Sequence, residues 1–232
     1  QEDNAAHIYM DPGSDNILIQ NNYIHDYITG GYSGNAANGI IIFGSQPYSG
    51  GMNITIQNNE IYGNLIQAIY YKHSQVSDLT SMTIIKNNLI HTTGNRSVTL
   101  SRDRVQFTNN VIYGGTIGLT LFIAAGPGAA NDTYVSHNTI LAQTGISITD
   151  QQYRTIIRDN IISDVTTTQD DRGIGVWHYG AASDTSNTTI DHTLVYSAAT
   201  TATIFVPGSG FVTVGALPSS ISGRVGNLAS TP

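Results

Sequence analysis

The residues best suited to chemistry in this sequence are cations at the ends of two successive apolar stretches. Lys72 and His73 follow Tyr70 in the first stretch, and Arg102 closes the second. A lysine can act as a general base near neutral pH when partial burial and a neighbouring cation lower its pKa. An arginine beside it can neutralise a carboxylate. These are the requirements of β-elimination, so Lys72 and Arg102 are the candidate catalytic residues, and Tyr70 and His73 are candidate substrate-binding residues.

A second set of residues is suited to hydrolysing a glycosidic bond or to stacking on a sugar ring. Glycoside hydrolysis needs two carboxyl groups facing one groove. The aspartates available for it are Asp150, Asp170, Asp171 and Asp184. Asp150 is also a candidate substrate-binding residue of the first site. Trp177 is the only tryptophan, and with His178 behind it this ring can stack on a sugar.

A recurring phrase indicates which elements position these residues. Short apolar segments surround one or two Asn residues, first in residues 17–24 and then in residues 54–61. The recurring positions are Asn22, Asn59, Asn88, Asn110, Asn138, Asn160 and, in degenerate form, Thr193. The shortest spacing is 22 residues, from Asn88 to Asn110, and longer spacings indicate insertions at corners. Such repeats are typical of solenoids.

The sequence therefore predicts an all-β fold, a right-handed parallel β-helix of about seven coils, with residues 1–232 in one domain. We expect the Asn residues to stack in one column at a tight corner. Asparagine suits such a corner because it tolerates left-handed backbone and because its side chains form ladders.

Each coil has a second short strand before the Asn phrase, with apolar residues at its second and fourth places. These strands begin at Gly39, Ala68, Ser97, Gly118, Gly145 and Gly173. Aligned by their first residues, they give an outward column of Phe43, Lys72, Ser101, Phe122, Thr149 and Trp177. The next column is Gly44, His73, Arg102, Ile123, Asp150 and His178. Long insertions follow most of these strand ends, so we expect a groove there.

Composition restricts the class of protein. The net charge is −7, with nine Lys and Arg and no basic run, so nucleic-acid binding is not expected. The absence of cysteine excludes disulfides and the usual cysteine zinc sites. No stretch approaches the roughly 20 apolar residues of a membrane span. His25 and His91 occupy matching places two coils apart, and no transition-metal site is predicted. The composition is compatible with a calcium ion held by loop aspartates and carbonyl groups.

Two segments resemble a known enzyme family. Residues 71–74 (Tyr-Lys-His-Ser) and residues 98–102 (Val-Thr-Leu-Ser-Arg) resemble the Lys and Arg segments of the alginate lyase and chondroitinase B family of polysaccharide lyases. The resemblance covers coils two to four. It implies that Lys72 takes the proton α to a uronate carboxyl and that Arg102 assists the leaving group. The calcium-binding acidic pair of that family has no counterpart, since residues 67–70 are Gln-Ala-Ile-Tyr.

The hypothesis that follows is a secreted or cell-surface protein whose partner is a polysaccharide. The first candidate function is a lyase that cleaves a uronate-containing glycan without a cofactor. The alternative is a non-catalytic β-helix, an adhesin or structural module that binds glycan or protein. A glycoside hydrolase that uses groove aspartates is the second alternative. Both ends of the sequence resemble cut ends, so we expect a piece of a longer protein. No oligomeric state is predicted.

Overall fold

The fold was obtained as a computed structural model. It describes residues 6–11, 13–25, 38–44, 53–63, 65–73, 82–101, 104–121, 130–149, 152–163, 168–169, 172–179, 188–196, 201–206 and 210–213. These residues form strands and turns, without a helix among them. The described ranges accordingly hold no helix of the length and apolarity that a membrane crossing requires.

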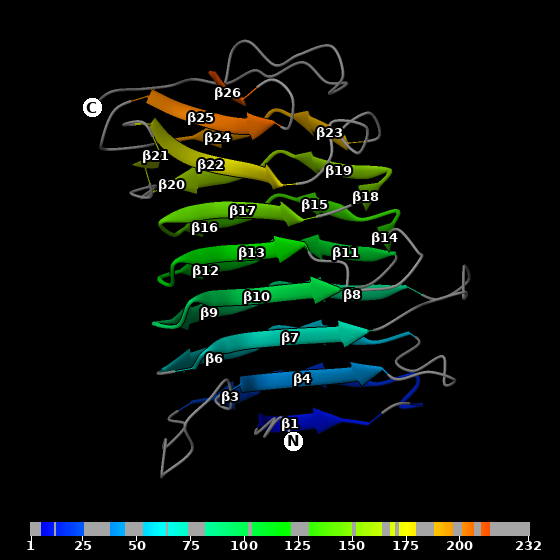
Figure 1. Ribbon diagram of the computed structural model, residues 1–232. Coiled ribbons are helices and arrows are strands. Elements are labelled where there is room, and N and C mark those ends of the chain that lie inside the picture. The colour runs from blue at the N-terminus through cyan, green and yellow to red at the C-terminus, as the bar shows by residue number, and fades with distance from the viewer. Residues whose placement is uncertain are drawn as a thin grey trace.

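Three parallel sheets wind the chain into a solenoid, because each coil adds one strand to each sheet in turn (Figure 1). Sheet A consists of β1 (Ala6–Met10), β4 (Asn38–Gly44), β7 (Gln67–His73), β10 (Arg96–Ser101), β13 (Ile117–Leu121), β17 (Thr144–Thr149), β22 (Arg172–Tyr179) and β25 (Thr201–Val206), with β21 (Thr168–Gln169) and β26 (Gly210–Thr213) added antiparallel. Sheet B consists of β2 (Leu18–Gln20), β5 (Thr55–Gln57), β8 (Thr83–Lys86), β11 (Val105–Thr108), β15 (Tyr134–Ser136), β19 (Thr155–Arg158) and β23 (Thr188–Asp191).

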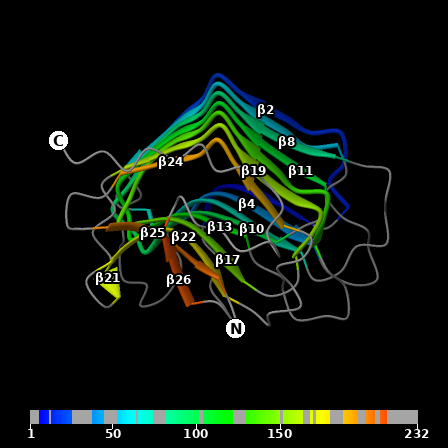
Figure 2. The same ribbon diagram turned by 90° about the horizontal axis from the view of Figure 1, so that it is seen from above.

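Sheet C consists of β3 (Tyr23–Ile24), β6 (Glu60–Gly63), β9 (Leu89–Thr92), β12 (Val111–Tyr113), β16 (Thr139–Leu141), β20 (Ile161–Ser163) and β24 (Leu194–Val195). A small parallel sheet pairs β14 (Ala130–Asn131) with β18 (Gln152–Tyr153). Seen along the solenoid axis, sheets B and C meet at a sharp corner and sheet A closes the third side (Figure 2). The predicted all-β parallel β-helix of about seven coils is confirmed.

The recurring Asn residues form a ladder at the corner between sheets B and C. The Oδ1 atom of Asn110 accepts hydrogen bonds from the backbone N–H of Asn88, at 3.0 Å, and from its Nδ2, at 2.9 Å. The Nδ2 of Asn110 in turn donates to the Ile85 carbonyl of the preceding coil. Equivalent bonds join Asn22, Asn59, Asn88, Asn110, Asn138 and Asn160. Thr193 takes the seventh place, fully buried. The predicted column is confirmed.

The left-handed backbone falls on the residue before each ladder member. Asn58 has a φ of 55° and Asn87 a φ of 56°, and both side chains are exposed. In the later coils the same place is held by His137, Asp159 and His192. The prediction gave the turn and the ladder to one residue. The structure divides them between two neighbours, because a ladder side chain must be buried whereas a left-handed turn residue directs its side chain to solvent here.

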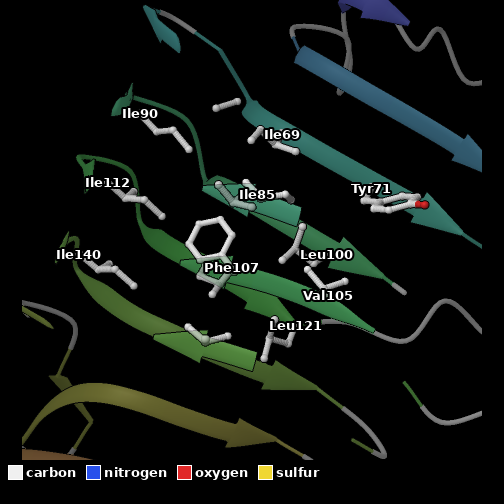
Figure 3. Packing of buried hydrophobic residues seen from close by; sticks show 14 of the residues in the cluster. Ile69, Tyr71, Ile85, Ile90, Leu100, Val105, Phe107, Ile112, Leu121 and Ile140 are labelled. Carbon is white, nitrogen blue, oxygen red and sulfur yellow. The ribbon is translucent and has the colours of Figure 1, made fainter. Parts of the chain in front are cut away.

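Aliphatic side chains from the three sheets fill the interior. Figure 3 shows Ile69 and Leu100 of sheet A, Phe107 of sheet B, and Ile90 and Ile112 of sheet C directed into the same space. Each of these residues is at most 2% exposed. Strand alternation brings one inward residue from each strand into register with the next coil, so the same kind of side chain recurs every coil.

Sheet A approaches sheet C so closely at one corner that several coils need glycine there. A Cβ on Gly145 would overlap the Ile162 side chain, and a Cβ on Gly175 would overlap Val195. Gly175 is therefore the residue of β22 that corresponds to Gly145 of β17, and Val176 pairs with Ile146. The alignment that put Gly173 opposite Gly145 is wrong by two residues, because β22 extends further upstream than the other strands of sheet A.

Buried threonine hydroxyls at the start of sheet B yield a stability prediction. Thr155 is fully buried and its Oγ1 has no hydrogen-bond partner in the described part of the chain. Its inward column also contains Val105, paired with Thr83. Thr155→Val should raise the free energy of unfolding by about 1 kcal/mol, since an unsatisfied buried hydroxyl costs about 1–3 kcal/mol. Denaturant unfolding measures this.

The control for that substitution is a buried threonine whose hydroxyl is satisfied. Thr193 is equally buried, and its Oγ1 donates to the Asp191 carbonyl at 3.2 Å. Thr193→Val should not stabilise the protein, because it removes a hydrogen bond. Equal gains from both substitutions would show that the missing partner of Thr155 is not the cause.

Candidate functional site

The outer face of sheet A carries a row of hydroxyl side chains between two aromatic residues. In-register pairing connects Tyr70, Thr99, Thr120, Ser147 and Trp177. Thr99 and Thr120 are each 1% exposed, and the Oγ1 atoms of both lack a hydrogen-bond partner within the part of the chain that the structure describes. Buried hydroxyls with unused hydrogen-bonding capacity on an outward face are suited to a ligand that is itself rich in hydroxyls.

Lys72 lies at the edge of this row, near the end of β7. It pairs with Phe43 on one side and with Ser101 on the other. Ser101 is buried, and Arg102 is the next residue in the chain. His73 is the last residue of β7. The predicted column of Phe43, Lys72 and Ser101 is thus found in the structure, and it brings Lys72 to the strand from which Arg102 continues.

Several predicted site residues lie outside the described residues. These are Arg102, Asp150, Asp170, Asp171 and Asp184. Lys72, His73, Trp177 and His178 are placed by their strand register. Tyr70 is partly exposed, whereas its neighbour Tyr71 is fully buried in the core.

Trp177 and His178 do not occupy the predicted columns. Trp177 pairs with Ser147 rather than standing beside Thr149, so it belongs to the hydroxyl row. His178 pairs with Ile148, a core residue, and Tyr179 takes the place beside Thr149. The cause is the two-residue offset of β22 that the packing of Gly175 imposes. The alignment therefore no longer places His178 next to Asp150.

The hydroxyl row itself was not predicted from the sequence. Its members stand at the third place of the short strands that begin at Ser97, Gly118 and Gly145, between the apolar second and fourth places. The sequence signal is the recurrence of a small hydroxyl residue there. Burial of this face could not be inferred from the strand pattern, which is the same for an exposed outward position.

A separate group of charges lies where sheet B begins. Arg104, Asp132 and Arg154 all have left-handed backbone, with φ values of 55°, 57° and 55°. The Nη2 of Arg154 donates to Oδ2 of Asp132 at 2.9 Å, and the hydrogen bonds from Arg154 lower the pKa of the Asp132 carboxyl. The side chains of Arg154 and Asp132 are 61% and 43% exposed, so the pair contributes at most about 1 kcal/mol to stability.

Two histidines in or directly after strands of sheet C stack on tyrosine rings. His25 stacks on Tyr62 with 5.0 Å between ring centroids, and His91 stacks on Tyr113 at 4.0 Å. Among the described residues, no group of three or more His, Asp or Glu side chains could hold a metal ion.

Comparison with known proteins identifies the fold family. A family model described as a right-handed beta helix region matches residues 38–215. The chain belongs to this right-handed β-helix family. β-Helix domains are common in polysaccharide-acting enzymes and also occur in non-catalytic proteins. Searches of curated proteins and of solved structures found no match. The resemblance of this β-helix to alginate lyase and chondroitinase B stays a prediction.

Proposed function

We propose that this β-helix protein binds a polysaccharide along the outer face of sheet A and cleaves a uronate-containing chain there. The observation that carries the proposal is the pairing of Lys72 with Ser101, the residue before Arg102. Paired strands lie about 4.8 Å apart, so Lys72 lies beside the residue after which the chain continues to Arg102. Two of the nine Lys and Arg residues can therefore flank one sugar residue.

The chemistry follows from the two side chains. In its neutral form, Lys72 takes the proton α to the uronate carboxyl, and the electrons of that C–H bond form a double bond to the β carbon. The glycosidic oxygen on the β carbon leaves with the electrons of the broken bond and takes a proton from water to become a hydroxyl. Arg102 holds the carboxylate, on which negative charge develops as the proton departs. Tyr70, two residues before Lys72 in β7, contacts the sugar beside this position in the proposal, and His73 ends the strand.

The test is the release of an unsaturated uronate product, which absorbs in the ultraviolet. The panel consists of alginate, polygalacturonate, chondroitin sulfate and hyaluronan, with dextran as the control without carboxyl groups. We expect absorbance to rise with at least one uronate polymer and not with dextran. No rise with any uronate polymer would reject the lyase.

A non-catalytic binding module is the second candidate function. The hydroxyl row favours it, because the Oγ1 atoms of Thr99 and Thr120 have no hydrogen-bond partner in the described part of the chain and suit sugar hydroxyls without a catalytic base. Affinity electrophoresis in gels that contain the same polymers separates the candidates. A binding module migrates more slowly in such a gel but releases no product. Release of reducing ends without ultraviolet absorbance would instead point to the aspartates and a glycoside hydrolase. All three candidates imply a secreted or cell-surface location.

A further inference from the structure

A shallow groove of about 450 Å³ crosses three coils at the corner between sheets B and C. Figure 2 shows that this corner lies across the solenoid from sheet A. Its lining includes the left-handed turn residues Asn21, Asn58 and Asn87, together with Tyr23, Glu60 and Leu89. The groove is therefore separate from the face to which the proposed function is assigned.

The turn residues offer free amides to this groove. The backbone N–H of Asn58 donates to the Lys86 carbonyl, and that of Asn87 to the Thr108 carbonyl. Their side-chain amides, like that of Asn21, are exposed and form no hydrogen bond within the described ranges. Each amide presents donors and an acceptor together, a combination that matches adjacent sugar hydroxyls.

The turn alone does not explain the choice of asparagine. The later coils make the same left-handed turn with His137, Asp159 and His192, so other residues satisfy the backbone there. Successive coils lie about 4.8 Å apart, which repeats the amides at about the length of one pyranose unit. A chain of sugars laid along the solenoid axis would thus meet one amide per unit.

An exposed aromatic ring stands beside these amides. Tyr23 is 70% exposed and meets Tyr62 edge to face, with 6.4 Å between centroids. Its hydroxyl donates to the Glu60 carboxylate, and this hydrogen bond raises the pKa of Tyr23. Tyr23 pairs in register with Glu60 of the next coil, so its largely solvent-facing ring adjoins the hydroxyl-binding groups.

We infer that this groove binds a neutral oligosaccharide, with its hydroxyls on Asn21, Asn58 and Asn87 and one sugar ring against Tyr23. The lining residues that the structure describes include no Lys or Arg, and the Glu60 carboxylate opposes an anionic glycan by like-charge repulsion. The volume falls in the range of about 300–1,000 Å³ typical of small-ligand sites. The site does not depend on cleavage at sheet A.

The experiment is a titration followed by the side-chain amide signals of the ¹⁵N-labelled protein. Cellotetraose, xylotetraose and chitotetraose are the neutral probes, and tetragalacturonate is the anionic control. We expect at least one neutral probe at millimolar concentration to shift the amides of Asn21, Asn58 and Asn87. Tetragalacturonate should leave them in place.

Three variants locate the binding. Asn58→Gly keeps the left-handed turn but removes the amide, and should weaken binding about 3- to 10-fold. Tyr23→Ala should weaken it by a similar factor, about 3- to 10-fold. Asn109 makes the same turn, with a φ of 56°, one coil beyond the groove, so Asn109→Gly is the matched control and should bind like the parent.

Each contrary outcome overturns the inference. Absence of shifts with all three neutral probes excludes the site, and equal weakening by Asn58→Gly and Asn109→Gly places binding elsewhere. Equal shifts with tetragalacturonate would contradict the neutral ligand class, and concentration-dependent shifts without sugar would identify a second copy of the chain as the occupant. Lys72→Ala should leave this titration unchanged, so the failure of the lyase and the failure of this site are told apart.

Discussion

The Lys72→Ala protein is expected to cleave its uronate polymer at least about 100-fold more slowly than the parent, the loss typical of a missing general base. Its thermal unfolding should stay that of the parent, because the backbone of Lys72 keeps its pairing with Phe43 and Ser101. Initial rates of ultraviolet absorbance and circular-dichroism melting curves measure the two effects.

Lys86→Ala is the matched control. It removes the same positive charge as Lys72→Ala, but from sheet B instead of sheet A. It should cleave at the parental rate. Arg102→Ala should bind the anionic polymer more weakly and lose the salt dependence of that binding. An unchanged rate of ultraviolet absorbance in the Lys72→Ala protein would rule out Lys72 as the base of the β-elimination.

The repeat could be predicted from the sequence because every coil requires the same hydrogen-bonding side chain at its corner. The ladder position must offer an acceptor and donors at the coil spacing, and asparagine supplies both, as between Asn88 and Asn110. The division of turn and ladder between neighbours was missed because Asn-Asn pairs occupy both places in the first coils. Asp159 and His192, at the turn place of later coils, carried the missing information.

The site was predicted less completely, because its decisive features are tertiary. Two-residue alternation suffices to bring Lys72 beside Ser101. The offset of β22 arises from a contact between Gly175 and Val195, which no pattern within the strand reveals. Burial of Thr99 and the free amide of Asn58 likewise depend on what other coils place around them.

The Asn110→Ala protein is expected to lose at least about 3 kcal/mol of unfolding free energy. The substitution leaves the backbone N–H and the Nδ2 of Asn88 without their acceptor, and it removes a donor from the Ile85 carbonyl. All these groups are buried, and each unsatisfied group costs about 1–3 kcal/mol. For a chain of this size the melting temperature should fall by about 6–12 °C.

Asn22→Ala tests whether burial in the ladder, rather than the amide alone, produces that loss. Asn22 is exposed at the first rung, where it donates to Asn59, and no other rung in the described ranges donates to it. Its replacement should therefore cost less than about 1 kcal/mol of unfolding free energy, because water can satisfy the groups that it leaves.

Asn109→Gly, which changes only the turn residue next to Asn110, should also cost little unfolding free energy, since glycine adopts the φ of 56° without strain. If Asn22→Ala and Asn110→Ala destabilised the protein equally, the interior rungs would contribute no more than a surface hydrogen bond, and the stability of the solenoid would have to come from the stacked aliphatic columns alone.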